Sequence, residues 1–163
     1  MMADPQIMLR VHRSYAMMLQ FYGARMVNKE TGQLERTEGY QPRLAHLNCK
    51  RHNFLRITRI LKFLGEVGLE RWKFPLIVFL ANEALYCRSI PNAVSSLTDY
   101  WIGTLRSDIE YKHAVMVGRK ELPISKALLF VKDRSISYVH SSGAEGNSTN
   151  GAGGEGSKSI GGG

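Results

Sequence analysis

Apolar residues recur at steps of three and four along most of the chain, which is the spacing of one face of an α-helix. The first such stripe consists of Met8, Val11, Tyr15, Met18, Leu19 and Tyr22. Asp4 and Pro5 precede it, and this pair favours a helix start because Asp accepts hydrogen bonds from first-turn amides and Pro lacks an amide that would be unpaired there. Gly23 follows the stripe and is typical of a helix end. The pattern therefore predicts a first helix between Pro5 and Gly23.

The segment after this helix is polar. Residues 24–41 contain Asn28, Gly32 and Gly39 and have no helical stripe, so they are predicted to form a loop. A connection of this length is longer than most and is typical of a mobile or ligand-binding segment. Helical patterns resume over residues 42–47 and residues 53–64, and Gly65 closes the second of them.

The rest of the chain also reads as helices. Residues 76–85 are apolar around most of the circumference and predict the most buried helix, and a later stripe predicts a helix from residue 94 to about residue 113. Residues 127–131 and 135–139 are short and partly β-branched, so helix and strand both stay open there. No segment alternates long enough to predict a strand with certainty. Trp72, Phe79, Tyr100 and Trp101 are the expected aromatic anchors of an all-α domain of about five or six helices.

Composition separates the C-terminal end from this domain. Residues 141–163 hold nine of the 16 glycines and one large apolar residue, Ile160. They are predicted to be a disordered Gly/Ser-rich tail after a single helical domain over residues 1–140. A GxGxxG match and an Asn-Ser-Thr sequon fall within the tail, where no strand, helix or secretion signal accompanies them. Residues 1–140 carry a formal net charge of +9, against +8 for the whole chain.

Several classes of protein are disfavoured. The longest uncharged stretches, residues 74–82 and 89–98, are about half of the roughly 20 residues that cross a bilayer. The N-terminus lacks the basic leader of a secretory signal. Cys49 and Cys87 lie 38 residues apart without metal-ligand spacing. We expect them to be reduced, buried thiols of an intracellular protein.

A catalytic or metal-binding constellation is not found. The five histidines are scattered, and neither an HExxH pair nor a GxSxG motif occurs. The sequence therefore predicts a non-enzymatic protein without a cofactor.

Basic residues are concentrated in one region. Between Glu38 and Glu66 lie 27 residues without an acid. On the helix over residues 53–64, one face is apolar and the other is basic, and the candidate site residues on the basic face are His52, Arg56, Arg59 and Lys62. This face would suit an anionic partner such as nucleic acid, an acidic protein surface or anionic lipid, and a face that is only solvated stays open as the alternative. Phe63 falls on the same side, which indicates that another segment covers part of it.

Five segments of the sequence resemble one family. HNFLRITRILKFLGEVGLE (residues 52–70) is similar to the central motif of the opioid growth factor receptor domain, and MLQFYG (residues 18–23) resembles the motif on its preceding helix. Further support comes from Tyr40-Gln41, LAHLN (residues 44–48) and SIPNAVSSLTDYWI (residues 89–102). The resemblance covers residues 7–114.

The resemblance implies a receptor for the opioid growth factor, the pentapeptide methionine enkephalin, in signalling that restrains cell proliferation. It also implies a location in the nucleus or at the nuclear envelope, with any membrane association peripheral. Two features depart from the family: a preceding segment rich in aromatic and acidic residues is missing, as in a reduced paralogue or an incomplete gene model, and the C-terminal proline-rich repeats are absent.

The implied peptide would need an acid for its amine, apolar slots for its Tyr and Phe, and a cation for its carboxylate. Glu83, Asp99 and Asp108 are the helix-borne acids, and no spacing selects among them. The peptide-binding residues are therefore unknown at this stage. The alternative function is a helical adaptor that binds nucleic acid or an acidic protein through the basic helix face.

Overall fold

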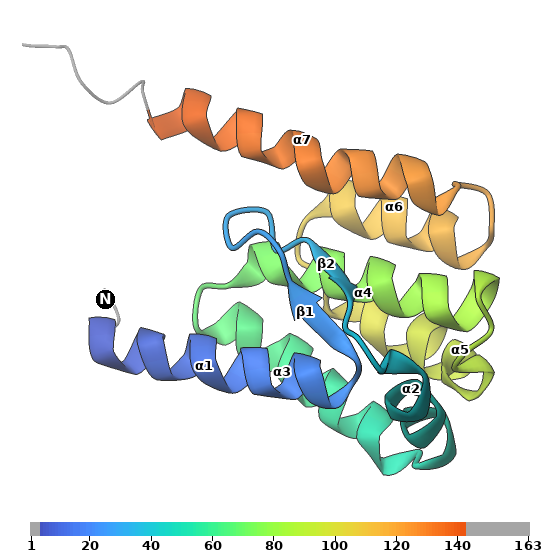
Figure 1. The fold of residues 1–163 in the computed structure, drawn as a ribbon. Coiled ribbons are helices and arrows are strands. Elements are labelled where there is room, and N and C mark those ends of the chain that lie inside the picture. The colour runs from blue at the N-terminus through green and yellow to red at the C-terminus, as the bar shows by residue number, and fades with distance from the viewer. Residues whose placement is uncertain (1–3, 143–163) are drawn as a thin grey trace, which may run out of the picture.

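The computed structural model describes the backbone of residues 4–142 and the side chains of residues 4–133. This part of the chain folds into α-helices and one short hairpin (Figure 1). The elements are α1 (Pro5–Phe21), β1 (Ala24–Met26), β2 (Leu34–Arg36), α2 (Tyr40–Cys49), α3 (His52–Glu66), α4 (Lys73–Ala81), α5 (Val94–Ser96), α6 (Asp108–Gly118) and α7 (Ile124–Ser142). The all-α prediction is confirmed. The predicted tail from residue 143 onward lies outside the described residues.

The first helix begins and ends where its sequence indicates. The Asp4 carboxylate accepts a hydrogen bond from the Gln6 amide at 2.8 Å, and Pro5 opens the helix. Gly23 has φ +79°, and a Cβ there would lie 3.2 Å from Tyr40. The glycine of the MLQFYG motif is thus needed both for the left-handed turn and for the close approach of α2.

The prediction of a structureless loop over residues 24–41 is wrong. β1 and β2 pair antiparallel, with Arg25 opposite Glu35. The turn between them lies on the core: Trp72 Nε1 donates to the Lys29 carbonyl at 2.8 Å, and a Cβ on Gly32 would lie 2.8 Å from the Trp72 ring. Contacts with a residue 43 positions away therefore order a segment whose local sequence is polar.

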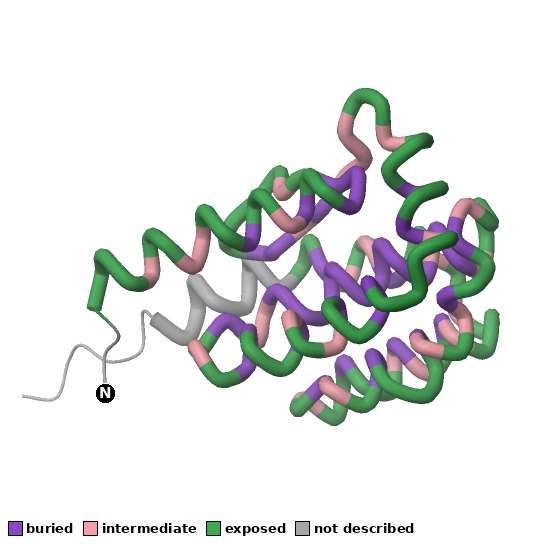
Figure 2. Tube along the Cα trace, turned by 90° about the horizontal axis from the view of Figure 1, so that it is seen from below, coloured by how far each residue is buried: buried purple, intermediate pink, exposed green. Residues whose placement is uncertain are grey.

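The centre of the molecule is α4. All nine of its residues are buried, as the continuous apolar pattern predicted, whereas the first turns of α1 are mostly exposed (Figure 2). The helix continues into a π-helical turn, Asn82–Tyr86. The hairpin, α6 and α7 all pack against α4, so this helix holds the hairpin and the C-terminal helices in one core.

Three of the four expected aromatic anchors are buried. Trp72 and Trp101 are 1% and 0% exposed and Phe79 is 8% exposed. Tyr100 is 60% exposed, so its assignment to the core is wrong. It lies beside Trp101 in a π-helical turn, Leu97–Trp101, and the turn directs only one of the two rings inward.

The predicted helix over residues 94–113 is interrupted. The π-helical turn is followed by a 3-10 turn, Ile102–Thr104, and by extended backbone at Leu105. Ser107 then caps α6, accepting from the Glu110 amide at 3.5 Å. A Ser before Asp and Glu is a helix start signal, and the apolar stripe running through it obscured the boundary. Residues 127–131 and 135–139, whose sequence favours neither helix nor strand, are both helical within α7.

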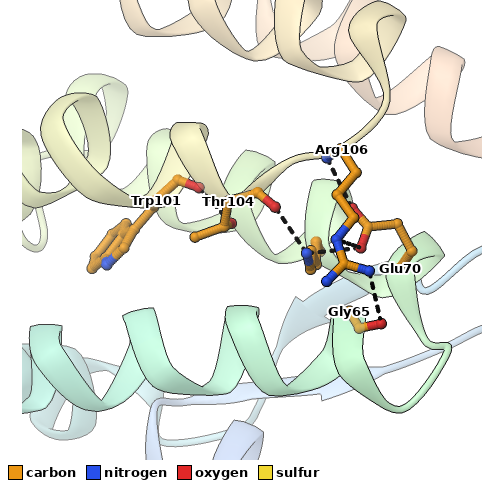
Figure 3. Close-up of polar contacts among 6 residues, drawn as sticks. Gly65, Glu70, Trp101, Thr104 and Arg106 are labelled. Atoms are coloured by element: carbon orange, nitrogen blue, oxygen red, sulfur yellow. Dashed lines mark hydrogen bonds and ion pairs between the residues drawn. The ribbon is translucent and has the colours of Figure 1, made fainter.

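An ionic cluster around the buried Lys73 joins α3, α4 and the segment before α6 (Figure 3). Lys73 is buried, and its ammonium donates to the Thr104 carbonyl at 2.8 Å and pairs with Glu70 at 2.7 Å. Arg106 donates its backbone amide to Glu70 at 3.1 Å and its guanidinium to the Gly65 carbonyl at 3.2 Å. The GEVGLE end of the central motif is thus a structural junction that receives Lys73 and Arg106.

We expect Gly65→Ala to lower the free energy of unfolding by about 1 to 3 kcal/mol, because overpacking costs this much in a filled interior. A Cβ at Gly65 would lie 2.5 Å from Lys73 Nζ and 2.9 Å from Glu70 Oε2, so it would displace a buried ammonium from both partners. Gly103→Ala is the matched control, since a Cβ there meets nothing within 4 Å. Urea denaturation of both variants measures the difference, and equal midpoints would contradict the expectation.

Candidate functional site

The predicted basic face lies on the outside of α3. His52, Arg56, Arg59 and Lys62 are all exposed. Among the described residues none of the four forms an ion pair, and Arg56 makes a hydrogen bond of 3.2 Å to Asn53 Oδ1. The structure thus leaves the positive charge of this helix uncompensated. Phe63 is 47% exposed and lines a small pocket together with residues of α1, so another segment covers this side of α3 only in part, as expected.

The basic face extends toward the end of α1. Burial raises the pKa of Tyr22 to about 12, and the positive charge of Arg56 opposes that shift. The influence of Arg56 on Tyr22 means that the two motifs resembling the family, on α1 and α3, meet in space. Between the two helices lies a small pocket of about 100 Å³, which is lined by Met18 of the first motif and by Ile60, Phe63 and Leu64 of the second.

Of the three acids considered for a peptide amine, Glu83 is already paired. It is fully buried, and both of its oxygens accept from Arg36: Nε at 2.6 Å and Nη2 at 3.0 Å. Asp99 and Asp108 are exposed on separate elements: Asp99 lies in the second π-helical turn, Leu97–Trp101, and Asp108 at the start of α6. The structure does not bring these acids together.

Two residues, Glu83 and Tyr40, hold the Arg36 side chain. Besides its two bonds to Glu83, its Nη1 donates to the Tyr40 hydroxyl at 3.1 Å, and the guanidinium lies 4.3 Å from the centre of the Tyr40 ring. The hydrogen bond to Glu83 raises the pKa of Arg36, although burial opposes it. This bidentate geometry joins the hairpin to the π-helical turn after α4, Asn82–Tyr86. It is the stronger form of an arginine–carboxylate pair.

A cleft of about 300 Å³ lies next to this pair. Its sides come from the hairpin strand β2, from α4 with the following turn, and from α7. Its apolar lining consists of Leu34, Pro75, Val78, Phe79, Ile124, Leu128 and Val131. A mostly apolar concavity with a few polar groups is the usual form of a small-ligand site, and this volume is at the low end of the usual range of about 300 to 1,000 Å³. We take this cleft as the candidate site.

Sequence reasoning did not find the cleft. Its residues come from segments almost 100 positions apart, from Gln33 to Val131, and one wall was assigned to a loop. One signal was present: Glu83 is a charged residue within the most apolar helical pattern of the chain. Since a buried carboxylate needs a partner, that position indicated a hidden cation.

Other candidate chemistry does not converge. Cys49 and Cys87 are free thiols, but both are exposed, so the prediction that they are buried is wrong. Within residues 4–142, no group of three or more His, Cys, Asp or Glu residues is arranged to hold a metal ion. No helix in this part of the chain is long and apolar enough to span a bilayer.

Comparison with known proteins identifies one family. Residues 1–134 match the opioid growth factor receptor conserved region. Opioid growth factor receptor-like protein 1 of Mus musculus is 40% identical over 117 residues, which are 72% of this chain and 25% of that protein. The opioid growth factor receptor of Homo sapiens is 45% identical over 104 residues, covering 64% of this chain and 15% of that protein. The match to the Xenopus tropicalis receptor-like protein 1 is 42% identical over 93 residues, 57% of this chain and 18% of that protein.

The chain spans about a quarter or less of the length of these relatives. No solved structure matches it. The family match nevertheless covers almost all of the helical domain, including the hairpin, the ionic junction and the cleft. The chain therefore belongs to the opioid growth factor receptor family.

Proposed function

We propose that this chain is a non-enzymatic, receptor-like signalling module whose ligand is an opioid peptide, methionine enkephalin. The family match over residues 1–134, with relatives named as opioid growth factor receptors, is the observation that carries the proposal. The family resemblance further suggests action in the nucleus or at the nuclear envelope, with peripheral contact to membranes.

The cleft beside β2 supports peptide binding on energetic grounds. A pentapeptide of about 40 heavy atoms, at about −0.3 kcal/mol per atom, reaches nanomolar affinity at best. Ordering its residues costs roughly 1 to 2 kcal/mol each. Net binding therefore requires a site that is already formed, and the cleft lies between α4 and two elements that pack on it, β2 and α7.

Isothermal titration calorimetry with methionine enkephalin tests this function. We expect saturable heat with a stoichiometry near one, and no saturable heat from a peptide of the same composition in reversed order. The folded state of the sample is checked by its thermal melt. A folded sample that gives no heat at high micromolar peptide would show that this chain does not bind it.

The basic face of α3 supports a second candidate function, an adaptor for nucleic acid or an acidic protein. The supporting observation is the exposure of His52, Arg56, Arg59 and Lys62 without an ion pair among the described residues. Exposed, unpaired cations on one face attract polyanions, and the binding weakens as salt increases.

For this second function we expect Arg56→Glu with Arg59→Glu to abolish binding to a DNA duplex or to polyglutamate without changing the melt. Reversal of two exposed cations elsewhere, Arg119→Glu with Lys120→Glu, is the matched control. For duplex DNA the logarithm of affinity should fall with that of salt by about 0.9 per phosphate contacted. Equal binding by the two double variants would exclude the α3 face.

A further inference from the structure

One edge of the hairpin is free. The amide of Val27 donates to the carbonyl of Gln33 and that of Thr37 donates to Gly23, which fixes the hydrogen-bonded pairs of the ladder. Because such pairs alternate in an antiparallel ladder, the N–H and C=O groups of Leu34 and Arg36 point away from β1. No hydrogen bond within the described part of the chain uses these four groups. β2 thus presents an unpaired strand edge.

This free edge borders the cleft. Four consecutive residues, Gln33 to Arg36, line the cavity. Successive side chains of a strand point to opposite faces, so four in a row line one space only if that space lies along the edge of the strand. The cleft therefore has backbone donors and acceptors along one wall and the apolar side chains of α4 and α7 along the others.

The charges around the cleft are already neutralised. Of the three charged residues in its lining, Glu35 pairs with Arg25, and Arg36 pairs with Glu83. The side-chain amides of Gln33 and Asn82, which also line it, have no hydrogen bond within the described residues. A phosphate finds no free counter-ion here, and the charged ends of a peptide would have to lie outside the cleft, in solvent. The uncharged part of such a peptide finds main-chain partners, apolar surface and two amides.

We infer that the cleft binds an extended peptide with uncharged, partly aromatic side chains, which adds to β2 as a third strand. Strand addition takes its affinity from main-chain hydrogen bonds and its specificity from pockets for alternate side chains. The inference rests on the proposed function, for which it names the site. A three-residue edge suits a short peptide better than a second copy of the chain, since stable dimers bury about 1,200 Å² or more. Residues 143–163 contain one large apolar residue, Ile160, and so offer little to this lining.

Neighbouring positions on α7 provide a matched test. Leu128 lines the cleft, whereas Leu129 is 57% exposed and does not. Titration of methionine enkephalin should give wild-type affinity for Leu129→Trp and at least a tenfold loss for Leu128→Trp, whose indole would fill the cleft. Equal affinities of the two folded variants would place the peptide elsewhere and overturn the inference, while wild-type binding would leave the proposed function intact. Absence of wild-type binding would refute both.

A second measurement uses the unaltered protein and tests strand addition even if the Leu128→Trp variant does not fold. Single N-methyl groups are placed in turn on the four backbone amides of the peptide, those of its residues 2 to 5. Strand addition predicts alternation: about a tenfold loss where the amide faces β2, as for one lost hydrogen bond, and little change at the amides between. A uniform response would exclude strand addition. A wild-type dimer that Leu128→Trp dissociates and that the peptide does not displace would name a second copy as the occupant and overturn the inference.

Discussion

Trp101→Ala is expected to lower the free energy of unfolding by about 3 to 5 kcal/mol, the usual cost of truncating a buried tryptophan. Trp101 is 0% exposed, and its ring packs edge to face on Phe54 with the centroids 6.0 Å apart. Its Nε1 donates to the Thr58 hydroxyl at 3.1 Å and is 3.3 Å from the Phe54 carbonyl. Truncation would leave a cavity between α3 and the π-helical turn Leu97–Trp101, and it would remove these polar contacts. Urea denaturation measures the loss.

Tyr100→Ala is the matched control for this prediction. Tyr100 adjoins Trp101 in the chain but is 60% exposed, so its truncation should change stability by about 0.5 kcal/mol or less. Similar losses for the two variants would mean that the assignment of Trp101 to the core and of Tyr100 to the surface is wrong.

Arg36→Met is expected to cost about 3 kcal/mol, because it leaves the Glu83 carboxylate buried without a counter-ion. Glu83 is 0% exposed and both of its oxygens bind Arg36. We choose the lower end of the range for breaking a buried pair because the Arg36 side chain is itself 35% exposed. Thermal and urea unfolding should both report the loss, since the pair joins the hairpin to the helix that forms the core.

The same hairpin contains the control pair. Arg25 and Glu35 also form a salt bridge, but their side chains are 63% and 43% exposed, so Arg25→Met should cost no more than about 1 kcal/mol. Combining Arg36→Met with Glu83→Leu should be less destabilising than Arg36→Met alone, because no charge is then left buried. If Arg25→Met and Arg36→Met cost the same, burial of Glu83 does not govern the stability of the hairpin.

Much of the helical structure could be predicted because its causes are local. Asp4, Pro5 and Gly23 act on residues within a turn of themselves, and the stripe on α3 separates an apolar from a basic face through helical periodicity alone. The resemblance to the family rested on short motifs and is confirmed over residues 1–134.

The errors share a different cause. Tyr100 and Trp101 are both aromatic and adjacent, and only the π-helical turn decides which one is buried. The polar hairpin sequence carries no strong strand pattern, so its order depends on Trp72 and Glu83, which lie more than 40 positions away. The exposure of the two cysteines likewise depends on tertiary structure. Cys49 is the last residue of α2 and Cys87 follows the π-helical turn Asn82–Tyr86, and both positions lie at the surface.

By itself the sequence determined the helical class, the buried character of α4, the basic face of α3 and the family. The tertiary structure alone decided that the polar segment is a hairpin, that Arg36 neutralises Glu83, and that β2, α4 and α7 enclose a cleft. The physical reason is the separation of the partners along the chain. Periodicity and capping act over about four residues. The Arg36–Glu83 pair spans 47 positions and the Lys73–Thr104 bond spans 31, and no local pattern encodes which distant residue will be the partner.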